Sequence, residues 1–211
     1  MLERGDPRSV VAVDPSAGFV EHAAQAIADR RARFEVGTGD GLPCADQSVD
    51  AVISALAYNF MPDRAAALTE FRRVARPDAT IAFYVWDYPG GGVGFIDTFW
   101  KAAIDLDPAA APLDESTRFP FCTRDELRRE ASAAGYRDVS VEPMEVATPF
   151  ADFAAFRHPF TLGAGPAPGY LASLPDGSQQ ALWQRLNDQL GDTRTDLTAR
   201  AWAVKARPGS T

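Results

Sequence analysis

Short apolar runs alternate with amphipathic segments along the first part of this chain, and this alternation limits the fold more than any other feature. The first run, 10–13, is bounded by polar residues and ends at Asp14. Similar runs follow at 34–36, 49–56 and 80–86. Because consecutive positions within these runs are apolar, they predict strands that helices cover on both faces. The pattern is typical of an α/β fold with a mostly parallel sheet.

Helices are predicted between the strands from capping residues and from apolar spacing. Ser16 stands where an N-cap would, before apolar residues at helical intervals. A second helix is predicted over 63–75 with Pro77 closing it, and a third over 95–104. A further helix over 123–135 begins with a capping-box pattern and ends at a glycine.

The second half of the chain predicts an antiparallel edge and an insertion. The segments 138–147 and 197–207 alternate as half-exposed strands do. We therefore expect a Rossmann-like, doubly wound sheet with an antiparallel C-terminal edge, in one domain spanning the chain. Its cofactor half would cover about 9–90, and a substrate or cap insertion about 91–122 and 147–195. Six phenylalanines are expected to form a satellite apolar cluster that could serve as a lid: Phe119, Phe121, Phe150, Phe153, Phe156 and Phe160.

Charge and cysteine content exclude several function classes. The net charge of -8 is spread over the 211 residues, which disfavours a nucleic-acid groove. The two cysteines, Cys44 and Cys122, lack the spacing of a zinc site or of a disulfide scaffold. No apolar run approaches the roughly 18 residues of a membrane span. We expect a cytoplasmic protein that holds no metal and binds neither nucleic acid nor membrane.

The acid at the end of the first run points to a ligand. In doubly wound sheets, ligands bind beyond the carboxyl ends of the strands, and an acid there can bind ribose hydroxyls. A carboxylate suits this task because it accepts two hydrogen bonds from vicinal hydroxyls. Alternatively, Asp14 caps the helix after Ser16 or forms an Asx turn before Pro15.

Three later blocks extend the pattern: "GTGDGLP" at 37–43, "SALAYNFMPD" at 54–63 and "EFRRVARPDATIAFYVWD" at 70–87. In order and spacing, the succession resembles the class I S-adenosylmethionine-dependent methyltransferases of the small-molecule type. The resemblance covers residues 10–88 well and 123–146 loosely. It implies that the chain transfers a methyl group from S-adenosylmethionine to a small-molecule acceptor.

The same resemblance implies a set of cofactor-binding residues. The matching positions are Asp14, Thr38, Gly39, Asp40, Ser54, Ala55 and Asn59. Asp14 would bind the ribose hydroxyls, and Asn59 would lie near the methionine end. Two departures from the family pattern stand out. Thr38 replaces an acid beside the adenine, and Asn59 with Phe60 replaces a pair of histidines.

The glycine loop of the family is not found upstream of Asp14. Such a loop normally lies about 20 residues before the ribose-binding acid, and thirteen residues precede Asp14. Either the reading frame starts at an internal Met, or the chain is a shortened member whose first strand is missing. In the family, that strand lies between the strands predicted at 10–13 and 49–56. These two strands would then pair with each other or be covered by a second chain, so we expect a homodimer.

Catalytic candidates follow the fourth predicted strand and lie in the insertion. Asp87 and Tyr88 could contact an acceptor, together with Tyr58 and Trp86, and His158 could act as a base. Packing in the core or at its rim is the alternative for the aromatic residues. Two other functions stay open: a catalytically impaired methyltransferase-like module for binding or dimerisation, and a nicotinamide-dependent oxidoreductase.

Overall fold

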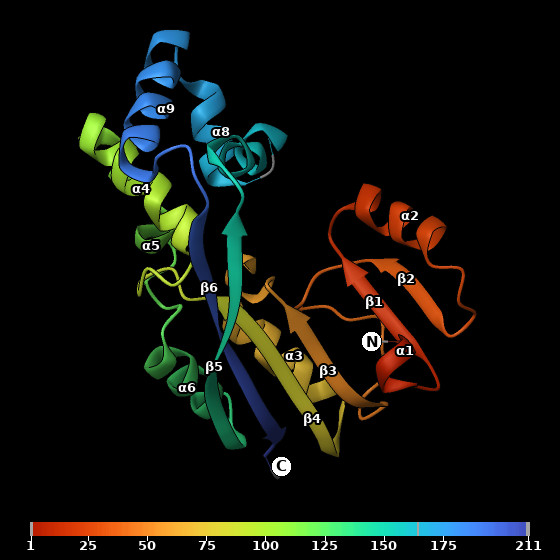
Figure 1. Ribbon diagram of the computed structural model, residues 1–211. Helices are drawn as coiled ribbons and strands as arrows, with labels where there is room; N and C mark the ends of the chain where they lie inside the picture. Colours follow the sequence, from red (N-terminus) through yellow and green to blue (C-terminus); the bar gives the residue numbers. More distant parts are fainter. Residues whose placement is uncertain (1, 164, 210–211) are drawn as a thin grey trace. The chain divides into compact units, whose positions relative to one another are not determined.

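The computed structural model describes residues 2–163 and 165–209, which form parts of two compact units (Figure 1). The first unit comprises Met1–Phe83, Glu130–Val139 and Lys205–Thr211. The second comprises Tyr84–Arg129 and Ser140–Val204. Residue 164, which falls in the predicted insertion at about 147–195, and residues 1, 210 and 211 lie outside the described part.

The first unit begins with the predicted strand, turn and helix. After the short helix α1 (Leu2–Gly5), strand β1 (Val10–Asp14) leads into helix α2 (Ala17–Ala26). Ser16 is the N-cap of α2, because its side chain accepts a hydrogen bond from the backbone N–H of Phe19 at 3.4 Å. Strand β2 (Ala32–Val36) then pairs with β1 in parallel.

The next segment contains β3 (Val49–Ala55), the 3₁₀ turn η1 (Tyr58–Phe60), α3 (Arg64–Val74) and β4 (Ala75–Trp86). The predicted order is confirmed, but the predicted boundary between helix and strand is wrong. Strand β4 starts at Ala75, so Pro77 lies within a strand. Residues preceding a proline avoid helical backbone angles, and extended geometry therefore begins before the proline.

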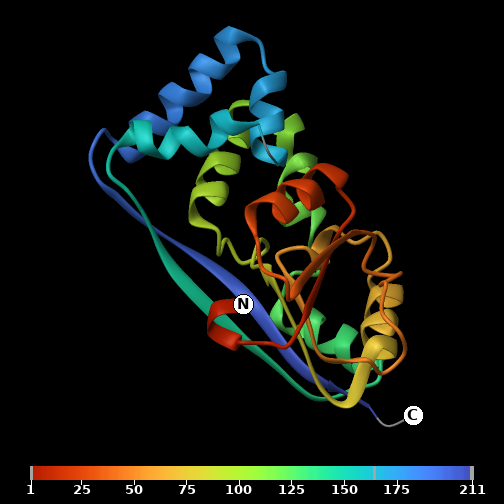
Figure 2. The same ribbon diagram turned by 90° about the vertical axis from the view of Figure 1, so that its right-hand side faces the viewer.

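A four-stranded sheet has the order β3-β4-β6-β5. Helix α6 (Arg124–Ala133) precedes β5 (Tyr136–Phe150), and β6 (Thr195–Pro208) ends the described chain. Strands β5 and β6 run in opposite directions side by side (Figures 1 and 2). The mixed sheet with its antiparallel edge confirms the predicted α/β class. Strands β5 and β6 are both longer than predicted.

Strands β1 and β2 form a separate two-stranded sheet. Sequence reasoning left open that β1 pairs directly with β3. Within the described residues, β3 pairs with β4 and β1 with β2, so direct pairing of β1 with β3 is wrong. In Figure 1 the arrows of β1 and β3 point the same way. Each of these strands therefore keeps one backbone edge without a strand partner in the described chain.

The second unit is mainly helical. Its helices are α4 (Gly94–Leu106), η2 (Pro108–Leu113), α5 (Glu115–Arg118), α7 (Phe153–Arg157), η3 (His158–Leu162), α8 (Pro166–Ser173) and α9 (Asp176–Leu190). Helix α4 packs against α8 and α9 (Figure 2). Within the predicted insertion, residues 105–120 contain η2 and α5, which Asp107 and Asp114 cap. No described helix combines the length and the apolar character that crossing a membrane requires.

Aromatic side chains dominate the core of the second unit. Phe156 and Phe160 are buried in it beside Phe99, while Phe150 and Phe153 pack against its surface. These four members of the predicted phenylalanine cluster therefore lie together. The remaining two, Phe119 and Phe121, contact each other with ring centroids 6.2 Å apart, and Phe119 also contacts Tyr88.

Candidate functional site

The carboxyl ends of β1 and β2 bring the first predicted site residues together. The backbone N–H of Gly37 donates to the carbonyl of Asp14 at 3.1 Å, so the two strand ends lie side by side. Gly39 lies against Met61, because a Cβ atom added there would be 2.7 Å from the Met61 sulfur. A side chain at position 39 would require the flexible end of Met61 to shift. The loop after β2 therefore meets the segment after β3, which carries Asn59.

Asp14 has the local turn that sequence reasoning named as the alternative. Its Oδ1 accepts a hydrogen bond from the backbone N–H of Ser16 at 2.8 Å, which is an Asx turn. The side chain is half-buried. A carboxylate has about four acceptor positions, so this turn leaves room for further donors. The turn orients the carboxylate and does not exclude a ligand.

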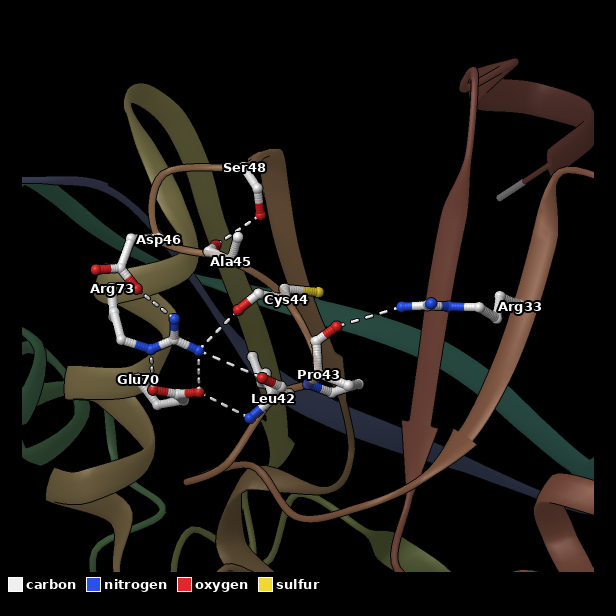
Figure 3. A network of polar contacts seen from close by, with 9 residues as sticks. All are labelled: Arg33, Leu42, Pro43, Cys44, Ala45, Asp46, Ser48, Glu70 and Arg73. Atoms are coloured by element: carbon white, nitrogen blue, oxygen red, sulfur yellow. Dashed lines mark hydrogen bonds and ion pairs between the residues drawn. The ribbon is translucent and has the colours of Figure 1, made fainter.

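Thr38 and Asp40 are exposed, and the chain just beyond them is fixed to α3 by a polar network (Figure 3). Glu70 accepts from the backbone N–H of Leu42 at 2.7 Å, and Arg73 contacts Glu70 at 2.7 Å. Arg73 also donates to the carbonyl of Cys44 at 2.9 Å and pairs with Asp46 at 2.5 Å. We call Glu70, Arg73 and Asp46 the loop clamp. Hydrogen bonds from Arg73, opposed by burial, hold the pKa of Glu70 below its ordinary value.

Two polar side chains at the end of β3 are buried without partners. Ser54 is 8% exposed and Asn59 is 5% exposed. Among the described residues, the Ser54 Oγ and the Asn59 Nδ2 have no hydrogen-bond partner. Buried polar atoms are almost always paired with protein or with water, and leaving one unpaired is costly. These two atoms therefore indicate a place where a polar ligand or an ordered water binds.

The backbone between these two residues is strained. Leu56 has a φ of +54°, a left-handed value that is rare for a bulky side chain. Ala55 beside it is exposed. Strain of this kind clusters at binding and catalytic sites, where the surrounding structure holds it in place.

Both carboxylate oxygens of Asp87 accept hydrogen bonds within the second unit. It is 3% exposed, and its Oδ2 accepts from Arg200 Nη2 at 2.6 Å and Nε at 2.7 Å. Its Oδ1 accepts from the backbone N–H of Gly90 at 3.0 Å. These contacts indicate that Asp87 holds the 90–94 loop. To act as a base, Asp87 would first have to break its ion pair with Arg200.

Tyr88 and His158 have different environments. Burial, with a smaller effect from nearby Glu115, raises the pKa of Tyr88, so its phenol stays protonated at neutral pH. His158 is exposed in η3, and its carbonyl accepts from the Thr161 hydroxyl at 2.7 Å. Trp86 is half-buried at the end of β4. Tyr88 lines a cavity of about 10 Å³, which is room for a single water.

A larger groove of about 680 Å³ contains none of the predicted site residues. It lies between α4 and α9, and its lining includes Lys101, Asp105, Arg185 and Asp188. An ion pair joins Arg185 to Asp105 there. We place no site in this groove, because its charges neutralise each other.

Comparison with known proteins finds a family match for the first part of the chain. Residues 1–83 match the methyltransferase domain family. A malonyl-[acyl-carrier protein] O-methyltransferase of Yersinia pestis is 40% identical over 77 residues, which are 36% of this chain and 28% of that protein. A demethylmenaquinone methyltransferase of Roseiflexus is 34% identical over 140 residues, which are 62% of this chain and 58% of that protein. This chain therefore spans less than two thirds of either relative.

Solved structures show the same fold over almost the whole chain. A Bacillus halodurans protein assigned as a methyltransferase has a TM-score of 0.59 at 14% identity, covering 96% of this chain and 84% of that one. Residues 1–83 match the methyltransferase domain family, and the chain as a whole shares the α/β fold of these solved structures. Phosphoethanolamine N-methyltransferase 2 of Haemonchus contortus, solved with S-adenosylhomocysteine, has a TM-score of 0.54 at 14% identity, covering 96% and 44%.

Sequence reasoning missed several residues that shape the candidate site and its surroundings. Glu70 and Glu130 accept hydrogen bonds that fix the segments after β2 and β3. Glu115 is a buried acid, 3% exposed, that accepts a hydrogen bond from the Trp100 indole. Its pKa is raised by burial. Glu70 and Arg73 share one face of α3 at a spacing of three, which is a usable signal, whereas no local pattern marks the other two acids.

Proposed function

We propose that this chain binds S-adenosylmethionine at the carboxyl ends of β1, β2 and β3 and transfers its methyl group to a small-molecule acceptor. The observation that carries the proposal is the pair of buried, unpartnered polar atoms, Ser54 Oγ and Asn59 Nδ2. Both belong to the set that the family resemblance predicted from sequence. Both lie in the part of the chain that matches the methyltransferase domain family.

The residues present fit the cofactor in kind. Asp14 supplies a half-buried carboxylate for ribose hydroxyls. Gly39 is packed against Met61 and keeps the backbone of the second loop open to a flat base, with Thr38 and Asp40 exposed beside it. Ser54 donates or accepts through its hydroxyl, and Asn59 donates through its amide.

S-adenosylmethionine, when bound, supplies a methyl group on a positively charged sulfur. The task of the chain in such a transfer is to align the acceptor and to keep water away. Asp87, Tyr88 and His158 stay proposals for the acceptor side. Of these, His158 alone has an exposed titratable side chain. Because the relatives named above act on unlike acceptors, the proposal stops at a small molecule.

Calorimetric titration with S-adenosylhomocysteine tests the proposal. We expect binding by the wild-type chain and a loss of about tenfold or more in Asp14→Ala, because that variant lacks the ribose acceptor. Asp50→Ala on β3 is the matched control, since Asp50 is 71% exposed and pairs with Arg76 on the surface. Absence of binding by the wild-type chain would contradict the proposal.

We further propose that a second copy covers the free edges of β1 and β3. Both strands lack a partner on one side in the described chain, and Val36 and Ile53 are 58% and 50% exposed. Unpaired strand edges favour association. Light scattering should then give twice the chain mass. A dimer without cofactor binding would favour the alternative of a binding module, whereas a monomer would contradict this part of the proposal.

A cytoplasmic location also stays part of the proposal. Among the described residues, neither Cys44 nor Cys122 forms a disulfide, as a reducing compartment allows. Localisation of a tagged chain in cell fractions would test it.

A further inference from the structure

We propose that Glu130 is a positioning residue, which holds Asn59 in place by binding the Tyr58 hydroxyl. Glu130 lies on α6, far along the chain from η1. The Tyr58 hydroxyl donates to Glu130 Oε2 at 2.7 Å across 72 positions of sequence. The proposal rests on the function proposed above, because Asn59 is there assigned to the cofactor.

The Glu130 carboxylate is itself held by a cation. Arg64, the first residue of α3, places Nη2 2.6 Å from Glu130 Oε1 and its Nε 3.2 Å from the same atom. The side chains of Arg64 and Glu130 are 28% and 23% exposed. A charge-assisted pair with two donors on one guanidinium fixes the carboxylate in direction as well as in position. One acid thus joins α6, α3 and η1 within the first unit.

Tyr58 is suited to connect Glu130 to the segment that carries Asn59. It is fully buried, and its ring centroid lies 4.4 Å from that of Phe83 on β4. Burial, then the Glu130 hydrogen bond and charge, raise the pKa of Tyr58 well above its ordinary value. The phenol therefore stays protonated at neutral pH and can donate this hydrogen bond.

The segment that carries Asn59 depends on such an anchor. Its backbone turns on two short-range bonds, from Phe60 N to the Ala57 carbonyl and from Met61 N to the Tyr58 carbonyl. Leu56 enters it with strained backbone geometry. Strained turns persist only where their surroundings fix them. Loss of the Tyr58 bond would therefore let Asn59 move relative to Ser54.

Binding measurements on matched variants test the proposal. Tyr58→Phe keeps the ring against Phe83 and removes one oxygen, so we expect it to fold. We expect the dissociation constant for S-adenosylhomocysteine to rise about tenfold in Tyr58→Phe and in Glu130→Ala. Glu130→Gln keeps an acceptor for the phenol and should recover part of this loss. Glu126→Gln, which removes a surface pair with Arg129 on the same helix, should bind within about twofold of wild type.

A second readout separates this proposal from the proposed function. Hydrogen exchange at residues 58–61 should speed up in Tyr58→Phe, while exchange in β1 stays as in wild type. If Tyr58→Phe and Glu130→Ala lose stability but bind with wild-type affinity, the role is only structural and the positioning proposal fails. If the wild-type chain does not bind the cofactor product, the proposed function fails instead. In that case, hydrogen exchange at residues 58–61 of Tyr58→Phe decides the positioning proposal. Exchange rates equal to those of wild type would overturn it.

Discussion

Two sets of polar residues in the first unit differ in whether their polar atoms have hydrogen-bond partners. The loop clamp, Glu70 with Arg73 and Asp46, satisfies its charges and binds the backbone of the loop after β2. Ser54 at the end of β3 and Asn59 just after it are more buried than the loop clamp, whose Asp46 side chain is 77% exposed, but they have polar atoms without partners in the described chain. A satisfied group adds stability, whereas an unsatisfied buried group lowers it. The difference therefore distinguishes residues kept for the fold from residues available to a ligand.

The same distinction applies to the two aspartates at strand ends. Asp14 is half-buried and its carboxylate accepts one backbone hydrogen bond, from Ser16. Asp87 is nearly fully buried and accepts from Arg200 and Gly90. Position at the end of a strand made them look alike in the sequence. Their partners point to ligand binding for Asp14 and to support of a loop for Asp87.

Replacing Asp87 should have the largest effect on stability. Asp87→Ala removes the main partner of Arg200, which is one-third exposed, and leaves the Gly90 N–H without its acceptor. Breaking a buried pair from one side costs about 3 kcal/mol, so we expect a loss near this size in the free energy of unfolding, measured by urea denaturation. Glu145→Ala serves as the control, because Glu145 is 58% exposed and lies 3.5 Å from Arg200. Normal stability combined with lost methyl transfer would instead indicate a base.

Glu70 should come next, with a defined pH dependence. Glu70→Gln weakens the bonds to Arg73 and Leu42, and we expect it to lower the free energy of unfolding by about 1–2 kcal/mol at pH 7. The pKa of Glu70 lies below its ordinary value of 4.5 because of Arg73. Its contribution is therefore complete above that ordinary value and is lost as the pH falls through the folded-state pKa. Denaturation curves of both proteins should converge under acid, and a constant difference would rule out this ion pair as the cause.

Glu115 should show the opposite pH dependence. Burial raises its pKa, so its contribution is complete at low pH and is lost as the pH rises through the folded-state value. Glu115→Gln keeps an acceptor for the Trp100 indole and never ionises. We expect this variant to gain stability over wild type as the pH rises from 4 to 8. Melting temperatures across this range would check it, and a parallel course of the two proteins would refute it.

Sequence reasoning succeeded where local signals decide structure. Ser16, Asp63 and Thr123 each accept a backbone hydrogen bond near the start of a helix, and all three helices lie close to their predicted positions. It failed where a boundary depends on tertiary pairing. The extension of β5 and β6 beyond their alternating cores depends on pairing between strands more than forty positions apart.

The candidate site likewise contains residues that the sequence predicts and residues that it does not. The seven residues from Asp14 to Asn59 were predicted from the family resemblance and stay a prediction; they lie at or just after the ends of successive strands, which a parallel sheet brings together. Glu130 could not be found, because its partner Tyr58 is 72 positions away and no spacing rule connects them. The ion pair of Asp87 with Arg200, 113 positions away, could not be predicted from the sequence for the same reason.

Ser54→Ala should change stability least and gives the sharpest contrast with the loop clamp. The Ser54 hydroxyl is buried without a partner, so its removal should leave the free energy of unfolding within about 0.5 kcal/mol of wild type or raise it. Affinity for S-adenosylhomocysteine should still fall by about fivefold, because the ligand loses one hydrogen bond. Thr69→Ala on α3 is the control, since its hydroxyl is exposed and bonded to the Ala65 carbonyl. If Ser54→Ala were destabilised as much as Glu70→Gln while binding stayed normal, Ser54 would belong with the residues that serve the fold, and burial without a partner would no longer mark the ligand site.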